Sequence, residues 1–224
     1  MAERPRVWGF VLLSPILKNV FRLYYGPKVF GKGNIPRKGA VVVCSNHKHV
    51  LDQCLAVLAT HRPINYMAKA EYFKGSFAWF FKLVGCICVN RNGHDEEAKE
   101  AANAVLSSGR ALGIFPEGTR NKTDDLLGEF KFGAASLACK NEAMVVPVAV
   151  TGEYKFRSKT LATRIGTPFS AKGMTVEAVN TRLHDEIVRL INENLSEGYG
   201  TPEEFERAER YCVSKKTREI VPRR

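Results

Sequence analysis

Two residues of this chain, His47 and Asp52, have the types and the spacing for acid–base chemistry. Side chains five residues apart on one continuous helix point about 140° away from each other, because each residue turns the chain by about 100°. The pair can therefore meet only where the backbone bends between them, as at a strand end that leads into a helix. There the carboxylate accepts the imidazole Nδ1–H and leaves Nε2 as a general base. The simpler alternative is a solvated loop histidine.

A second polar turn spells F-P-E-G-T-R over residues 115–120 and follows the apolar run 111–115. Arg91 likewise follows a short apolar run. Ligands of an open parallel sheet bind outside the carboxyl ends of its strands, so we expect these groups to converge with His47. Arginines are suited to bidentate phosphate binding, and Gly118 lets the backbone approach a ligand closely.

The elements that must position these residues alternate between strand and helix patterns. Apolar and β-branched runs predict strands over 40–45, 64–68, 86–89, 111–115 and 144–150, and an edge strand over 163–169. Helices are expected over 50–59, 76–84, 95–107, 133–139, 176–195 and 202–212. The alternation predicts an α/β fold, a single domain with a mostly parallel central sheet flanked by helices.

Residues 5–25 form an apolar, aromatic segment with cationic residues within and after it. Its uncharged core, residues 7–17, is shorter than the ~20 residues that cross a bilayer. The segment predicts an amphipathic helix in the membrane interface, with its cations, such as Lys18 and Arg22, on anionic lipid. A helix packed on the protein's own core is the alternative.

The net charge of +11 is unevenly distributed. Residues 1–40 hold eight Lys and Arg against one Glu, residues 41–153 hold twelve of each sign, and residues 154–224 hold fourteen against ten. Anionic membranes and nucleic acids both attract such a charge. We expect a membrane-associating segment 1–30, a folded domain 31–213 and a mobile basic tail 214–224.

The composition is that of a folded protein, and 224 residues are enough for one sizeable core. The six cysteines form no C-x-x-C pair and no Cys/His cluster at zinc spacing, so no metal site is expected. We expect reduced thiols and a cytosolic environment. Together with the N-terminal segment, this predicts a peripheral or monotopic protein on the cytoplasmic side of the cell membrane.

Four sequence blocks occur in a fixed order: N-H-x4-D at 46–52, G-C-I-C-V-N-R at 85–91, F-P-E-G-T-R at 115–120 and V-V-P-V at 145–148. In these blocks the chain resembles the 1-acyl-glycerol-3-phosphate (lysophosphatidate) acyltransferase family, the PlsC-like proteins. Lys69-Ala70-Glu71 also resembles the K-x-E segment of that family. The resemblance covers about residues 30–152, and F-P-E-G-T-R is its most specific block.

The resemblance implies that His47 takes the proton of an acceptor hydroxyl that attacks an acyl thioester, while Asp52 orients the imidazole. It assigns the acceptor's glycerol phosphate to Lys69, Arg91, Glu117, Gly118, Thr119 and Arg120. A thioester is already activated, so no covalent nucleophile is required. The chain departs from the family at His49, where a serine is common, and in its N-terminus, which compresses the family's two-helix membrane element.

The expected reaction moves a fatty acyl group from acyl-CoA or acyl-ACP to the sn-2 hydroxyl of 1-acylglycerol 3-phosphate, which gives phosphatidate for phospholipid biosynthesis. The expected partners are lysophosphatidate, the thioester, an anionic membrane surface and, with acyl-ACP as donor, acyl carrier protein. No cofactor and no nucleic acid are expected. The alternatives are acyl transfer to glycerol 3-phosphate, another lysophospholipid or a lyso-aminolipid, and a non-catalytic basic protein that binds lipid or nucleic acid.

Simpler roles remain open for several of these residues. Glu117 either contacts the ligand or anchors its own loop by accepting backbone N–H bonds. Lys69 fits an ordinary surface lysine, and Arg120 fits an ion pair with Glu117 or Asp124. Three residues near His47 are alternatives as acyl-enzyme nucleophiles, namely Cys44, Ser45 and Cys54.

Overall fold

The centre of the fold is strand β2 (Val41–Ser45), whose residues are all buried. Its valine-rich sequence suits a strand that helices cover on both sides, because neither face then meets water. Strand β2 pairs in parallel with β5 (Ala111–Ile114) on one side and with β6 (Met144–Thr151) on the other. The computed structural model describes residues 7–76, 78–90 and 95–220.

The other strands are β1 (Lys28–Phe30), β3 (Ile64–Lys69), β4 (Ile87–Val89), β7 (Ala162–Ile165) and β8 (Phe169–Ser170). Within the described residues, one eight-stranded sheet has the order β1-β7-β6-β2-β5-β3-β4, with β8 beside β6. Strands β7 and β8 run antiparallel to β6, and the other pairs are parallel. The predicted α/β fold with a mostly parallel sheet is therefore confirmed.

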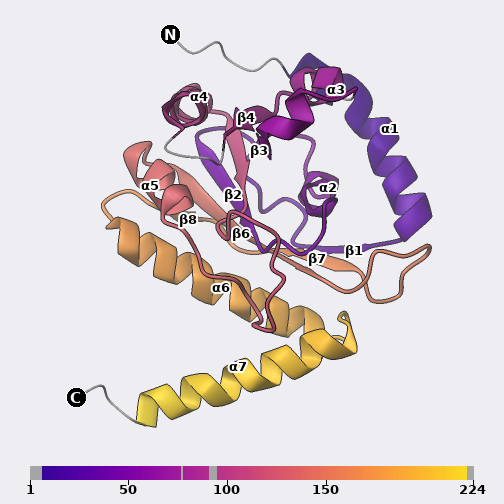
Figure 1. The fold of residues 1–224 in the computed structure, drawn as a ribbon, viewed down its shortest axis with the longest axis vertical. Coiled ribbons are helices and arrows are strands. Elements are labelled where there is room, and N and C mark those ends of the chain that lie inside the picture. The colour runs from indigo at the N-terminus through magenta and orange to yellow at the C-terminus, as the bar shows by residue number, and fades with distance from the viewer. Residues whose placement is uncertain (1–6, 77, 91–94, 221–224) are drawn as a thin grey trace.

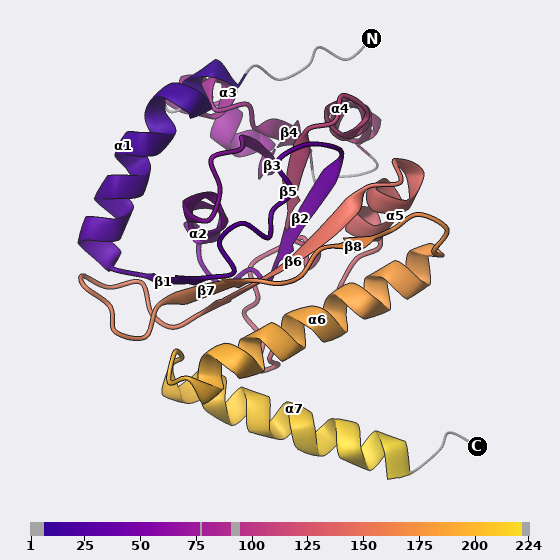
Figure 2. The ribbon, with the colours of Figure 1, turned by 180° about the vertical axis from the view of Figure 1, so that it is seen from behind.

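Helices cover both faces of the sheet (Figure 1; Figure 2 shows the same layers from behind). One face carries α4 (Glu96–Ser107), α5 (Gly133–Lys140) and α6 (Val176–Ser196), and α7 (Pro202–Ile220) lies on α6. The other face carries α2 (Asp52–Leu58) with α1 (Trp8–Tyr25) outside it, while α3 (Ala78–Leu83) follows the short 3-10 helix η1 (Ala70–Phe73) and contacts α1. Alternate residues of β2 join the core on the two sides: Val42 and Cys44 pack towards α4–α6, and Val41 and Val43 pack towards α2.

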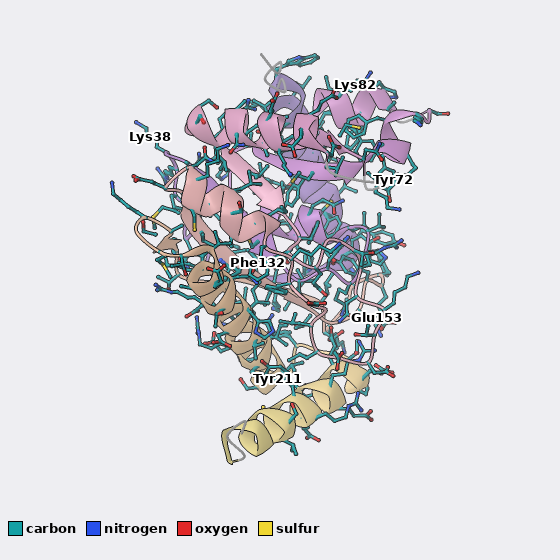
Figure 3. The ribbon with its side chains drawn as sticks, turned by 60° about the vertical axis from the view of Figure 1, so that its left-hand side comes forward. Lys38, Tyr72, Lys82, Phe132, Glu153 and Tyr211 are labelled. Atoms are coloured by element: carbon teal, nitrogen blue, oxygen red, sulfur yellow. The ribbon has the colours of Figure 1, made fainter. Side chains whose placement is uncertain are left out.

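Two of the predicted elements differ from the structure. The edge strand expected over 163–169 is two strands, and its first part, β7, is not at the edge because the unpredicted strand β1 pairs with its outer side. The helix expected over 202–212 continues to Ile220, into the segment predicted to be a tail, and residues 221–224 lie outside the described part of the chain. Tyr211 lies where α7 passes α6, with its ring 6.1 Å from that of His184 (Figure 3).

Helix α1 packs on α2 with an inner side that includes Lys18 beside Phe10 and Phe21, contrary to the expectation that Lys18 lies on lipid. Lys18 is 7% exposed, and its ammonium donates to the carbonyl oxygen of Thr60. Arg22 Nη2 donates to the carbonyl oxygen of Leu58 at 3.2 Å. These carbonyls lie at or just beyond the C-terminus of α2, where the helix dipole favours cations and where carbonyl groups lack partners within the helix.

The outer side of α1 is apolar and exposed. Its exposed large apolar residues are Trp8, Val11, Leu12, Ile16, Leu17, Val20, Leu23 and Tyr24. Single exposed apolar residues are common, but a continuous face of them marks an interaction surface. Trp79 of α3, which contacts α1, is also exposed. Among the described residues, we find no helix both long enough and apolar enough to cross a membrane.

Candidate active site

The turn between β2 and α2 carries His47 at the carboxyl edge of the sheet. Asn46 fixes the start of this turn, because its Nδ2 donates to the carbonyl oxygen of Val150 at 2.9 Å and its Oδ1 accepts the Val150 N–H at 2.8 Å. Asp52 is the first residue of α2. The backbone therefore bends between His47 and Asp52, as their spacing required.

The carboxylate of Asp52 is the hub of this turn, and the residue is 1% exposed. Its Oδ2 is 2.9 Å from His47 Nδ1. The same oxygen accepts the backbone N–H groups of Lys48 and His49, each at 2.7 Å. Its Oδ1 accepts the hydroxyl of Tyr154 at 2.6 Å. Four donors thus stabilise a buried negative charge, and that charge orients the His47 ring with Nδ1–H towards it.

The His47 ring lies flat against Phe115, which directly follows β5. The two ring centres are 3.9 Å apart with 14° between the planes, and 14% of the His47 side chain is exposed. Within the described residues, Nε2 of His47 has no hydrogen-bond partner, so this nitrogen is available to a substrate proton. A neutral imidazole held in this way is equipped for general-base catalysis.

His49 has a different environment, although it lies in the same turn. Its Nδ1 accepts the backbone N–H of Leu51 at 3.3 Å, and its ring stacks on Tyr154 at 4.2 Å. Burial lowers the pKa of His49, which the charge of Asp52 opposes. Of the two histidines, it is His47 that contacts the carboxylate through its ring.

Glu117, from the second polar turn, anchors the turn that carries His47. Its carboxylate is 4% exposed, and it accepts the N–H of His47 at 2.6 Å and the N–H of Gly128 at 2.8 Å, one on each oxygen. The N–H of Asn121 also donates to the His47 carbonyl oxygen at 2.7 Å. Burial raises the pKa of Glu117, while the two N–H bonds lower it. Since both oxygens are bonded within the protein, the geometry favours the anchoring role over direct ligand contact.

The three alternative nucleophiles near His47 are poorly suited to attack. Ser45 is 3% exposed, and its hydroxyl donates to the carbonyl oxygen of Asn46 at 3.0 Å. Burial raises the pKa of the Cys44 thiol, and it raises the pKa of the Cys54 thiol to about 11. The thiolate is the reactive form, so neither cysteine is activated.

Two of the residues assigned to the acceptor phosphate, Lys69 and Gly118, line one cavity of about 590 Å³ between α4 and α5. Phe115, which stacks on His47, lines it as well. Lys69 ends β3, and 43% of its side chain is exposed. Gly118 has a φ of +70°, and a Cβ there would come within 3.2 Å of the Lys131 side chain. Glycine therefore permits both this turn and the close passage of Lys131, a cavity-lining cation that the sequence did not indicate.

Thr119 and Arg120 are exposed at the tip of the same turn. Arg120 forms no ion pair, among the described residues, with either acid that was considered for it. Its positive charge lies near enough to His49 to lower the pKa of that ring. Arg91 lies outside the described residues, so its place in the site stays a prediction.

One further contact at the site joins residues from distant parts of the chain. Lys48 Nζ donates to Glu204 Oε1 and to the carbonyl oxygen of Gly152, the latter at 2.6 Å. Glu204 lies in the first turn of α7, and its Oε2 accepts the N–H groups of Gly152 and Thr201, both at 2.8 Å. Helix α7 thereby contributes to the wall of a second cavity of about 250 Å³, which His47 and Glu204 both line. The two bonded residues are 156 positions apart, so no local pattern pointed to the pair.

Comparison with known proteins identifies the family of this chain. The family model described as "Acyltransferase" matches residues 26–151, more than half of the chain, so the chain belongs to that family. Within it, the chain belongs to the PlsC-like 1-acyl-sn-glycerol-3-phosphate acyltransferases, as the four sequence blocks suggested.

Its relatives carry this name. The 1-acyl-sn-glycerol-3-phosphate acyltransferase of Bacillus subtilis is 31% identical over 158 residues, which cover 68% of this chain and 78% of that protein. The Borreliella burgdorferi enzyme of the same name is 32% identical over 136 residues, 59% of this chain and 54% of that protein. A Mycoplasma pneumoniae protein described as a probable enzyme of this type is 31% identical over 55% of its own length. The chain thus spans about half the length of the last two relatives.

A solved structure has the same fold. The crystal structure of the 1-acyl-sn-glycerophosphate (LPA) acyltransferase PlsC from Thermotoga maritima superposes with a TM-score of 0.69. The match covers 81% of this chain and 78% of that chain at 23% sequence identity. This likeness establishes the architecture, whereas the roles of individual residues rest on the site itself.

Proposed function

We propose that this acyltransferase moves a fatty acyl group from acyl-CoA or acyl-ACP to the sn-2 hydroxyl of 1-acylglycerol 3-phosphate, which gives phosphatidate. The observation that carries the proposal is the 2.9 Å contact between His47 Nδ1 and Asp52 Oδ2 at the carboxyl edge of the sheet. Relatives about 31% identical that carry the lysophosphatidate acyltransferase name support the choice of acceptor.

In the proposed reaction, His47 Nε2 accepts the proton of the acceptor hydroxyl while the hydroxyl oxygen attacks the thioester carbonyl carbon. The new C–O bond forms and the C–S bond breaks, and the leaving thiolate takes the proton back from the imidazolium. Asp52 stabilises the imidazolium between these steps. The blocked states of Cys44, Ser45 and Cys54 support direct attack over an acyl-enzyme intermediate.

Lys69, Gly118, Thr119 and Arg120 are proposed to bind the acceptor phosphate, together with Arg91. The supporting observation is that Lys69 and Gly118 line the same cavity as Phe115, the residue that stacks on the His47 ring. Lysine and arginine supply the charge for a phosphate, and Gly118 supplies close backbone approach. Glu117 is proposed to act through the backbone of His47, which it anchors.

The outer side of α1 is proposed to lie in the headgroup region of the cytoplasmic leaflet, with the protein attached to one side of the membrane. Its exposed apolar residues would enter the acyl boundary. The exposed cations available to anionic lipid, in place of the buried Lys18, follow α1: Lys28, Lys32, Arg37 and Lys38. Lysophosphatidate is itself a membrane lipid, so an enzyme docked in this way meets its acceptor at the surface.

The test is thiol release from palmitoyl- or oleoyl-CoA in detergent, with and without lysophosphatidate. Wild type is compared with His47→Ala and His49→Ala. We expect acceptor-dependent release that falls by about 10²–10⁴-fold in His47→Ala, the range that a general base contributes. His49→Ala is the matched control and should keep most of the activity, because its ring does not contact Asp52.

Two negative results would have different meanings. If wild type releases no thiol with CoA, acyl carrier protein thioesters and then glycerol 3-phosphate and other lysophospholipids are the next substrates to try. If His47→Ala is as active as wild type, the assignment of the base is wrong whatever the acceptor.

A further inference from the structure

Tyr154 lies just after β6, beyond the residues that the family model matches, and nothing in the sequence singled it out. Its hydroxyl donates to Asp52 Oδ1 at 2.6 Å. Within the described residues this is the one hydrogen bond to Oδ1, whereas Oδ2 receives three. A carboxylate that is held through both oxygens cannot rotate about its terminal torsion without breaking bonds. The Tyr154 hydroxyl therefore keeps Oδ2 facing His47.

We propose that Tyr154 is a positioning residue of the active site, which holds the Asp52 carboxylate in register with His47 and limits the basicity of the pair. This deepens the proposed function, since it concerns the same site. The phenol draws electron density to Oδ1, so less negative charge remains to stabilise a protonated His47. Removal of the hydroxyl would return that charge to the carboxylate and so favour the protonated imidazole.

The hydroxyl is suited to act as a permanent donor. Burial, followed by the charge of Asp52 and the hydrogen bond to it, raises the pKa of Tyr154 well above the ordinary value. The phenol therefore stays protonated whenever Asp52 is charged, and it can only donate to the carboxylate. The titratable groups that face Tyr154, His47 or Asp52 from the surrounding elements are Tyr25 of α1, Lys48 and His49 of the turn, Cys54 of α2, Tyr66 of β3, and Glu117 and Arg120.

The ring of Tyr154 is itself held from two sides. It stacks on His49 at 4.2 Å with 22° between the planes. Two aromatic residues on the inner side of α1 contact it edge-on, Phe21 at 6.4 Å and Tyr25 at 5.8 Å. Stacking on Tyr154 also keeps the His49 ring apart from Asp52. Tyr154 therefore supports the contact of His47 with Asp52 and holds His49 away from the same carboxylate.

The first test is the pH profile of kcat/KM for Tyr154→Phe, which keeps the ring and removes the hydroxyl. We expect kcat/KM to fall about tenfold near neutral pH, in line with the loss of one hydrogen bond to a charged group. We also expect the acidic limb, which reports the His47 pKa, to move to higher pH. A purely structural role would lower kcat/KM at every pH without moving that limb.

The matched control is Tyr66→Phe. Tyr66 is 7% exposed, and its hydroxyl has no hydrogen-bond partner among the described residues, so this variant also loses one buried phenol oxygen. Its acidic limb should coincide with that of wild type. An unmoved limb in Tyr154→Phe, or an equal shift in Tyr66→Phe, would overturn the positioning role.

A second measurement needs no substrate. The pKa of the His47 imidazole is followed by NMR in histidine-labelled protein, with His47→Ala used to assign its signal, in wild type and in Tyr154→Phe. A higher His47 pKa in Tyr154→Phe supports the proposal even if lysophosphatidate proves to be the wrong acceptor. An unchanged or lower His47 pKa overturns it even if the acyl transfer assay succeeds.

Discussion

The two ends of helix α2 are both held by charged side chains, but these side chains come from different distances along the chain. At the N-terminal end, Asp52 accepts from the His47 ring and from two backbone N–H groups of the same turn. At the C-terminal end, Lys18 and Arg22 of α1 donate to carbonyl groups 42 and 36 positions away. Both arrangements complement the helix dipole, with an anion at its start and cations at its end.

The two ends of α2 differ in what they contribute: the N-terminal end carries the proposed catalytic pair, and the C-terminal end holds the helix in place. A helix as short as α2 is marginal on its own, so its orientation depends on what holds its ends. The N-terminal end contains the groups proposed to face a substrate, whereas at the C-terminal end Lys18 is buried against protein and the exposed Arg22 donates to a backbone carbonyl. We therefore expect changes at the N-terminal end to act mainly on activity and changes at the C-terminal end to act mainly on stability.

The largest effect is expected from Asp52→Asn, which disrupts the hydrogen bonds at the N-terminal end of α2. An amide offers one acceptor oxygen where the carboxylate has two, so at least one present donor would face an NH2 group. We expect kcat/KM to fall by about 10²–10⁴-fold, as when the carboxylate partner of a catalytic histidine is lost. The acidic limb of the pH profile should move to lower pH, opposite in sign to Tyr154→Phe, because His47 loses a negative neighbour. Steady-state kinetics from pH 5 to 9 would show an unmoved limb if Asp52 does not act on His47.

The next prediction tests whether the outer side of α1 binds membrane without affecting the inner side, which packs on α2. In the double variant Leu12→Ser with Ile16→Ser, two exposed apolar side chains are removed from the outer side. We expect binding to anionic phospholipid vesicles to weaken about tenfold or more, since each buried aliphatic side chain contributes about 1.5–3 kcal/mol. Activity on detergent-dispersed substrate should stay near that of wild type.

Val213→Ser is the control for that experiment, because Val213 is an exposed apolar residue on the distant helix α7. Vesicle sedimentation at two salt concentrations separates the apolar contribution from the charge contribution, which salt screens. Equal binding by wild type and the double variant would assign membrane attachment, if any, to another surface.

The part of the site that could be predicted is the part encoded locally. His47 and Asp52 lie in one turn, and the strand that precedes them is a single β-branched run, so spacing and periodicity showed that they could meet, and the family resemblance favoured the pair. The same holds for the second polar turn, which follows β5. Each of these features depends on residues within one strand–turn unit.

The rest depends on contacts between distant parts of the chain. Tyr154 reaches Asp52 from 102 positions away, and Glu204 reaches Lys48 from 156 positions away, so neither belongs to a recognisable local pattern. Lys18 of α1 was misplaced for the same reason. From the sequence, an amphipathic helix with cations on one side predicts that those cations face lipid. That the carbonyl groups at the end of α2 need donors becomes visible only in the folded structure.

A smaller effect is expected from Lys18→Met, which removes a hydrogen-bond donor at the C-terminal end of α2. Methionine keeps most of the side-chain length. The Thr60 carbonyl oxygen would lose its ammonium partner, and we expect the free energy of unfolding to fall by about 1–2 kcal/mol. The change in kcat should stay below about threefold, because no group that faces substrate is altered.

Urea unfolding followed by circular dichroism measures this difference. The matched control is Lys38→Met, since Lys38 is exposed and extends from the surface (Figure 3). Surface substitutions of this kind change stability by less than about 0.5 kcal/mol. A Lys18→Met protein as stable as the control would show that α2 does not depend on its C-terminal cations.

The smallest effect is expected from Glu117→Gln, which changes how stability depends on pH at the N-terminal end of α2. Burial raises the pKa of this group in the folded protein, so the unfolded chain releases the proton at lower pH than the folded one. Ionisation therefore opposes folding, and its contribution to stability falls as the pH rises from the ordinary glutamate pKa to the raised one, then stays constant. In Glu117→Gln the group cannot titrate, so the difference in unfolding free energy between wild type and this variant should decline across that window. A difference that rises with pH would mean that the N–H bonds from His47 and Gly128 outweigh burial, and that the anchor favours the charged carboxylate from the start.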